Sequence, residues 1–159
     1  RDQPRSRGLG DVYKRQMGNM GTIIRTMLGF NYTNLAIIRP GVDVFDPRVI
    51  RASMGALFNI NFEYFNSFDE YLTKYPEREV YPLMLKGAKN IHQITAANNK
   101  HSLVFGNESS GLPDDYLKYG QSVFIPHSDK IDSLNLSMAL GITLCHFSMM
   151  EFKDKQVLR

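Results

Sequence analysis

Residues 102–113 read SLVFGNESSGLP and residues 123–137 read VFIPHSDKIDSLNLS, and these two stretches decide the fold. Each begins with a short apolar run, SLVF or VFIP, and continues into a polar segment rich in Gly, Asn, Ser and Pro. Short β-branched or aromatic runs that end in this way are typical of buried β-strands. In open α/β sheets, ligands bind where such strands pass into loops. The two loops are therefore the predicted functional site.

The rest of the chain alternates helical and strand patterns. Apolar spacing predicts helices at residues 19–29, 47–58, 68–72 and 134–152, with a short one from about residue 113, and Asn19 and Asp46 are the predicted N-caps of the first two. Strands are predicted at residues 35–38, 61–65, 80–85, 102–105 and 123–125, and Pro82 suits an edge strand. The alternation predicts an α/β fold with a largely parallel sheet and flanking helices.

A third segment adds two polar side chains. Residues 18–26 read GNMGTIIRT, so Asn19 and Arg25 stand six positions apart on a predicted helix. Six positions are nearly two helical turns, which places the amide and the guanidinium on roughly one face.

Together these segments resemble a known family. The patterns N-x5-R, F-G-N-E-x-x-G-L-P and I-P-x6-S-L-N-x-S resemble, in order and spacing, the three motifs of the SpoU (TrmH) family of RNA ribose 2′-O-methyltransferases, within the SPOUT superfamily. Residues 51–56, RASMGA, resemble the helix that the family carries between the first two motifs, and the resemblance covers roughly residues 18–151. It implies a SPOUT-type C-terminal deep trefoil knot, which periodicity does not reveal, and a homodimer packed across the knot and the last helix.

The resemblance also implies a cofactor, a substrate and a set of site residues. The cofactor is S-adenosylmethionine (AdoMet), and the substrate is the ribose of tRNA or rRNA. The loops expected to wrap the cofactor contribute Leu103, Phe105, Gly106, Asn107, Gly111, Ile125, Pro126, His127, Ser133 and Leu134. The residues expected to act in catalysis are Arg25, Asn19, Glu108, Ser133 and Asn135.

Arg25 is the residue we expect to matter most. A guanidinium with a pKa above about 12 is a poor proton acceptor. We therefore expect Arg25 to clamp the neighbouring phosphate and orient the ribose hydroxyl, rather than to remove its proton. Each residue has a plainer explanation when taken alone: Arg25 as a solvated surface residue, Ser133 and Asn135 as helix caps, and His127 as an exposed loop histidine. The co-occurrence of three motifs in family order favours the methyltransferase.

Residues 1–16, RDQPRSRGLGDVYKRQ, show no apolar periodicity and end in a stretch that looks like a translated sequencing adaptor. We treat them as a non-native tail outside the fold, and residues 17–159 as a methyltransferase domain that lacks its native first strand and any N-terminal RNA-binding domain. The tail holds five of the 19 basic and two of the 16 acidic residues, which leaves 14 of each from Met17 onward. Because that balance shows no basic surplus, the RNA assignment rests on the motifs.

Other patterns exclude several classes of protein. No apolar run approaches the roughly 20 residues of a membrane helix, and a single cysteine, Cys145, rules out a disulfide within the chain, so a cytoplasmic protein is expected. The four histidines are scattered, so no metal is expected, and the glycines at 106 and 111 are followed by Leu112 rather than the lysine of a phosphate-binding loop.

Two alternatives stay open: a SPOUT base methyltransferase, and an inactive RNA-binding or assembly module.

Overall fold

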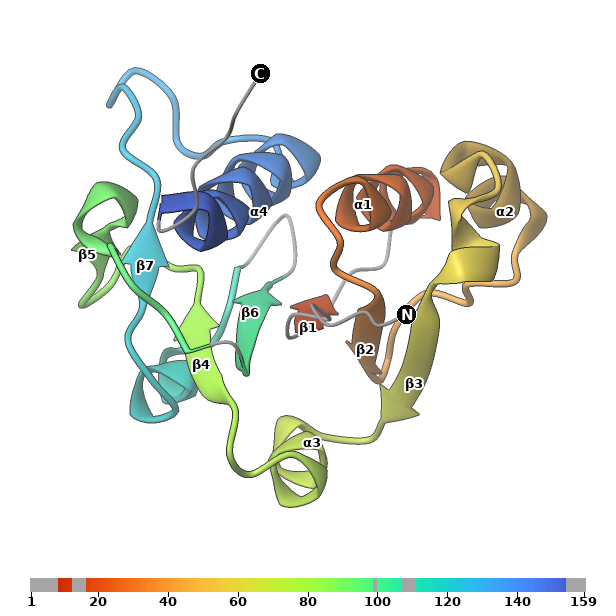
Figure 1. The fold of residues 1–159 in the computed structure, drawn as a ribbon, viewed down its shortest axis with the longest axis horizontal. Helices are drawn as coiled ribbons and strands as arrows, with labels where there is room; N and C mark the ends of the chain where they lie inside the picture. The colour runs from red at the N-terminus through yellow and green to blue at the C-terminus, as the bar shows by residue number, and fades with distance from the viewer. Residues whose placement is uncertain (1–8, 13–16, 99, 107–110, 154–159) are drawn as a thin grey trace.

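The structure is a computed structural model, and it describes residues 9–12, 17–98, 100–106 and 111–153, with side chains described from Met20 to Met150. In this part of the chain, five parallel strands form the central sheet in the order β3-β2-β1-β6-β4 (Figure 1). Their bounds are β1 Leu9–Val12, β2 Asn34–Ile38, β3 Asn61–Phe65, β4 Glu79–Pro82 and β6 His101–Phe105. The parallel α/β class predicted from the alternation is therefore confirmed.

Helices cover both faces of this sheet. Figure 1 shows α1 (Met17–Gly29), α2 (Pro47–Ser53) and α4 (Leu136–Lys153) on one side, and α3 (Phe68–Lys74) on the other. The larger apolar core lies under the first group and includes Ile23, Leu35, Leu103, Leu140 and Phe147. Short 3₁₀ helices complete the described elements: η1 (Ala56–Asn59), η2 (Ile91–Gln93) and η3 (Asp114–Lys118).

The centre of the sheet corrects one expectation. We expected residues 1–16 to take no part in the fold and the sheet to lack its first strand. Residues Leu9–Val12 form β1 between β2 and β6, with Gly10 opposite Leu35 on one side and Leu103 on the other. Main-chain groups make a parallel ladder, so a short segment without apolar periodicity can occupy this position. Periodicity alone therefore could not identify it.

Two helix predictions need correction. The first helix begins at Met17, so Asn19 lies inside α1 and is not its N-cap. The helix predicted at residues 47–58 ends at Ser53, because Met54 and Gly55 adopt left-handed conformations with φ of 51° and 87°, and η1 follows. A left-handed residue interrupts the α-helical hydrogen-bond ladder, and glycine tolerates it well.

Other local predictions are confirmed. Asp46 caps α2, where its side chain accepts a hydrogen bond from the backbone N–H of Arg48 at 2.8 Å, and Pro47 is the first helical residue. The strand at residues 61–65 has the predicted bounds. The strand predicted at residues 80–85 is the edge strand β4, as Pro82 indicated, but it spans only Glu79–Pro82.

The strand that carries the second loop lies outside the main sheet. β7 (Val123–Phe124) pairs in parallel with β5 (Lys89–Asn90). The chain after β4 joins the two sheets, because Leu83 N–H bonds to the carbonyl of Val104 and Met84 N–H to that of Val123, at 2.9 and 3.1 Å. This bridge brings the ends of β4, β6 and β7 to the same edge of the molecule.

A glycine lets α1 and α2 pack closely. A Cβ added at Gly21 would lie 2.3 Å from the Cβ of Ala52 and 2.8 Å from its backbone. We expect Gly21→Ala to lower stability by about 1–3 kcal/mol, the usual range for overpacking, despite the better helix propensity of alanine. The midpoint of urea unfolding measures this change.

Gly29→Ala is the matched control on the same helix, since nothing lies within 4 Å of its added Cβ. Its midpoint should equal or exceed that of the original chain. Equal midpoints for both variants would contradict the close-packing explanation.

Candidate active site

A cavity of about 490 Å³ opens at the edge where β4 and β6 end. Its walls come from segments far apart in sequence: residues 83–86 after β4, Phe105 and Gly106 at the end of β6, Gly111 and Leu112 beyond them, and residues 132–134 before α4. The volume falls within the range of about 300–1,000 Å³ typical of ligand sites. The two loops predicted as the site therefore do meet, and the loop after the edge strand joins them.

A smaller cavity of about 150 Å³ adjoins the first. The two share Leu83, Met84, Leu85, Ser133, Leu134 and Ala139. The smaller one adds Val123, Phe124, Ile125 and His127. Most of these side chains are apolar, so this cavity suits a flat, weakly polar group such as a purine, while the larger cavity holds the charged residues.

The loop after β6 closes tightly on its own start. A Cβ at Gly106 would lie 2.4 Å from the backbone carbon of Gly111 and 2.5 Å from the backbone nitrogen of Leu112. Gly111 has a φ of 68°, a conformation that other residues adopt only with strain. Glycine is thus required at 106 for space and favoured at 111 for its conformation.

An ion pair at the larger cavity was missed by the sequence analysis. Lys86 Nζ lies 2.8 Å from Asp114 Oδ2, and their hydrogen bond raises the pKa of the Lys86 ammonium. Both side chains are about two-thirds exposed, so the pair is screened by solvent. The predicted edge strand at residues 80–85 could have indicated that a third loop reaches this edge, had its pairing with residues 101–104 been known.

The predicted cofactor-binding residues occupy different places. Phe105, Gly106 and Gly111 line the larger cavity, Ile125 and His127 the smaller one, and Ser133 and Leu134 line both. His127 Nδ1 donates to the carbonyl of Ile125 at 2.8 Å, which fixes the ring against its own loop. Leu103 is buried in the core, and Pro126 is exposed; neither is part of the cavity walls. Asn107 lies outside the described residues.

The predicted catalytic residues are not all brought together. Arg25 lies exposed on α1, with its Nη1 3.1 Å from the sulfur of Met54, and it lines neither cavity. Asn19 lies in the first half of α1, but its side chain is outside the described part, as is Glu108.

The polar residues before α4 act in two ways. Asn135 Oδ1 accepts hydrogen bonds from the backbone N–H groups of Ser137 and Met138, at 3.0 and 3.3 Å, so its described contacts are those of a helix cap. Ser133 instead lines both cavities. The hydroxyl of Ser137 is buried and has no hydrogen-bond partner within the described ranges.

Two other kinds of site are absent from the described residues. Among the described residues, no three His, Cys, Asp or Glu side chains are grouped as metal ligands would be. In the same part of the chain, no helix has the length and apolar character needed to cross a bilayer.

Comparison with known proteins identifies the family. The model of the SpoU rRNA Methylase family matches residues 13–145. The chain therefore belongs to the SpoU rRNA methylase family.

Individual relatives agree with this assignment. A protein of Listeria innocua, to which the activity of a tRNA (cytidine(34)-2′-O)-methyltransferase is attributed, is 35% identical over 78% of this chain and 76% of its own length. The 23S rRNA (adenosine(1067)-2′-O)-methyltransferase of Streptomyces laurentii is 29% identical over 80% of this chain and 48% of its own.

A solved structure of an rRNA methyltransferase shares the fold. The AdoMet-bound rRNA methyltransferase from Sinorhizobium meliloti superposes with a TM-score of 0.81 and 28% identity, over 92% of this chain. This chain spans 58% of the length of that protein.

The close approach of Gly106 to the Gly111–Leu112 backbone provides a test of the cofactor site. AdoMet is the cofactor of this family, and the Cβ of Gly106→Ala would displace the Gly111–Leu112 backbone, which lines the cavity. We expect calorimetry to show at least about a tenfold loss of AdoMet affinity, equivalent to about 1.4 kcal/mol.

Gly141→Ala is the control, because its Cβ would lie 3.7 Å from the Thr26 side chain, at an ordinary contact distance. It should bind AdoMet like the original chain. Circular dichroism of both variants separates a local loss of binding from unfolding. A folded Gly106→Ala protein with unchanged affinity would refute the placement of the cofactor.

Proposed function

We propose that this chain is an RNA ribose 2′-O-methyltransferase that transfers a methyl group from AdoMet to a ribose 2′-hydroxyl. The observation that carries the proposal is the cavity where the loops after β4 and β6 meet residues 132–134, in a chain that belongs to the SpoU family. The tRNA with cytidine at position 34 is the first substrate to test, because the Listeria relative matches over most of both chains. The proposal places the enzyme in the cytoplasm with its RNA.

The residues of the cavity have a positioning role. AdoMet supplies an activated methyl group on a sulfonium, so the protein needs mainly to hold donor and hydroxyl in line. The apolar walls near Ile125 and Leu134 receive the adenine, and the close backbone at Gly106 and Gly111 offers main-chain groups. The Lys86–Asp114 pair lies at the same cavity. Its ammonium and carboxylate are complementary to the carboxylate and ammonium of the amino-acid part of AdoMet.

Arg25 is proposed to act on the RNA rather than on the cofactor. Its guanidinium is exposed on α1 and does not line the cavity of its own chain. A fork of N–H donors suits a phosphate oxygen pair, and a clamped phosphate fixes the ribose beside it. Proton loss from the hydroxyl follows to phosphate or water.

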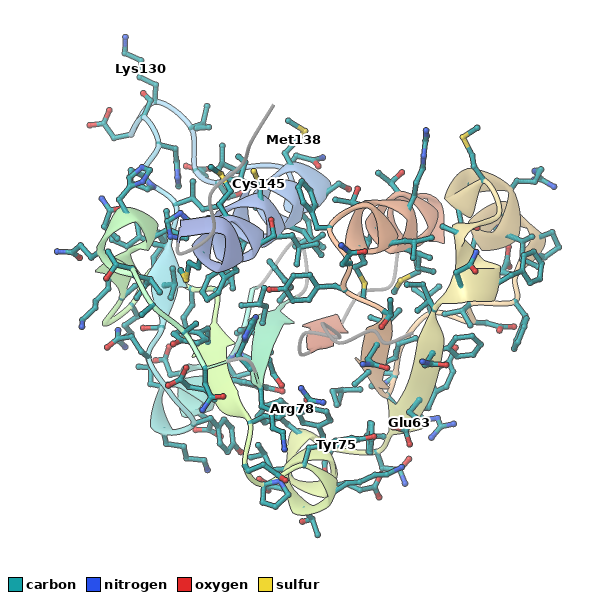
Figure 2. The ribbon with its side chains drawn as sticks, viewed as in Figure 1. Glu63, Tyr75, Arg78, Lys130, Met138 and Cys145 are labelled. Carbon is teal, nitrogen blue, oxygen red and sulfur yellow. The ribbon has the colours of Figure 1, made fainter. Side chains whose placement is uncertain are left out.

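In a homodimer, Arg25 can face the cavity of the partner protomer. Met138, Ile142, Cys145 and Met149 recur at intervals of four, three and four on α4, and the two methionines are 63% and 60% exposed. This spacing places them along one side of the helix, and Figure 2 shows Met138 and Cys145 on α4 away from the sheet. We propose that a second copy covers this stripe and that Arg25 of one protomer serves the cavity of its partner.

The C-terminal trefoil knot belongs to the same proposal. One observation supports it: residues 132–134, which follow β7 and precede α4, line the same cavity as the residues at the ends of β4 and β6. In the proposed knot, the chain after β7 passes through a wider loop made by earlier segments before it enters α4.

Arg25→Ala tests the assignment of the catalytic arginine. We expect methyl transfer to RNA to fall at least a hundredfold, because a charge-assisted clamp on the phosphate is worth about 1.5–3 kcal/mol and the orientation of the hydroxyl is lost with it. AdoMet affinity by calorimetry should stay unchanged. Arg25→Lys, which keeps the charge but loses the fork, should recover only part of the activity.

A mixing experiment tests the shared site. At an AdoMet concentration well below the Kd of the Gly106→Ala protein, the Arg25→Ala and Gly106→Ala proteins are each expected to have little activity. Refolding them together should restore activity if the arginine and the cavity come from different chains. Label on a base instead of a ribose, located by nucleoside mapping, would favour the base methyltransferase. Absence of transfer with AdoMet bound would favour an inactive RNA-binding module.

A further inference from the structure

A second surface lies beside Arg25, outside the cavities. Phe45, Met54 and Phe58 are 60%, 69% and 76% exposed, and they lie just before α2, just after it and in η1. We call this the α2 surface. Neighbouring exposed apolar side chains of this size mark an interaction site, since single ones are ordinary on a protein surface but clusters are not.

Two contacts connect the α2 surface to its surroundings. The Phe45 ring packs edge-on against Phe62, at 5.4 Å between centroids, and Phe62 on β3 is four residues beyond Phe58. Met54 lies four residues before Phe58, and its sulfur contacts the Arg25 guanidinium at 3.1 Å. The surface therefore extends from the edge strand β3 to the proposed catalytic arginine.

The charge near this surface is positive and consists of arginines. Between Met17 and Ile60 the chain has four basic residues, all arginine, and two acidic ones. Arg51 is exposed in the last turn of α2, and Arg48 is exposed while it pairs with Asp46. From residue 61 onward acidic residues outnumber basic ones by 12 to 10, and most of the basic residues are lysines.

Exposed aromatic rings beside arginines fit unpaired RNA better than they fit duplex RNA or a second copy of this chain. Exposed aromatic rings stack on unpaired bases of any sequence, and arginine both stacks and binds phosphate through two N–H groups. A paired RNA helix hides the faces of its bases, so it cannot use the rings. A second copy of this chain would fit the purely apolar stripe on α4, which carries no arginine, better than it fits the α2 surface.

We propose that the α2 surface binds the unpaired nucleotides that flank the methylated ribose, with Phe45, Met54 and Phe58 against the bases and Arg51 on a phosphate. The inference rests on the proposed function and specifies how RNA is held. It also accounts for RNA binding by a chain whose charges balance from Met17 onward, because stacking supplies affinity that a basic surplus would otherwise supply.

The test compares Phe58→Ala, Phe58→Trp and Ile131→Ala with the original chain. Ile131 is 49% exposed and lies outside the α2 surface and the cavities, so it is the matched control for loss of an exposed apolar side chain. Fluorescence anisotropy measures the Kd for three probes: an anticodon stem-loop with cytidine at position 34, an unstructured single strand and a fully paired RNA duplex.

Phe58→Ala is expected to weaken binding of the stem-loop and the single strand by about tenfold, in line with the loss of one stacked base, and to leave duplex binding unchanged. Phe58→Trp should retain the affinity, and Ile131→Ala should match the original chain. Arg51→Gln should weaken every probe and reduce the salt dependence of binding by roughly one phosphate contact.

Three other results would overturn the inference. Unchanged single-strand affinity in Phe58→Ala, with methyl transfer intact, removes the inference and leaves the proposed function standing. A lower molecular mass of Phe58→Ala by light scattering shows that a second copy covers the surface. An original chain that neither binds these RNAs nor methylates total RNA overturns both proposals.

Discussion

Gly106 lies so close to the backbone of Gly111 and Leu112 that a side chain at residue 106 has no room, and the rest of the site depends on this contact. The contact lies at the carboxyl end of β6. Because the strands are parallel, β4 ends at the same edge, and the bridge from Leu83 and Met84 brings β7 there as well. The cavity is therefore a consequence of strand direction and of one tight backbone approach.

The structure contains two regions of different chemical character. One region, the cavity at the ends of β4 and β6, has apolar walls and a small number of charges, which suits a compact donor. The other, on α1 and α2, presents arginines and exposed rings, which suits a nucleic acid. Arg25 belongs to the second region by its contact with Met54, and in the proposed homodimer it faces the cavity of the partner.

Much of the fold was predictable because it depends on near neighbours in sequence. The Asp46–Pro47 pair marked the start of α2, and the bounds of β3 and the edge position of β4 were predicted correctly. The end of α2 was not, because the left-handed conformation at Met54 interrupts an apolar pattern that continues through Leu57. β1 was missed for a different reason: its place in the sheet is set by main-chain pairing on both sides, which leaves little trace in side-chain spacing.

For the site, the sequence by itself determined the residue types: glycines at 106 and 111, the amide and serine before α4, and an arginine on the first helix. Tertiary structure decided which of them meet. It brought Ser133 to the cavity, used Asn135 as a helix cap, paired Lys86 with Asp114 and turned Arg25 toward Met54. The reason is that turn chemistry and helical period act over a few residues. The neighbours of a loop depend instead on strand order, which pairs residues as far apart in sequence as Leu9 and Ser102.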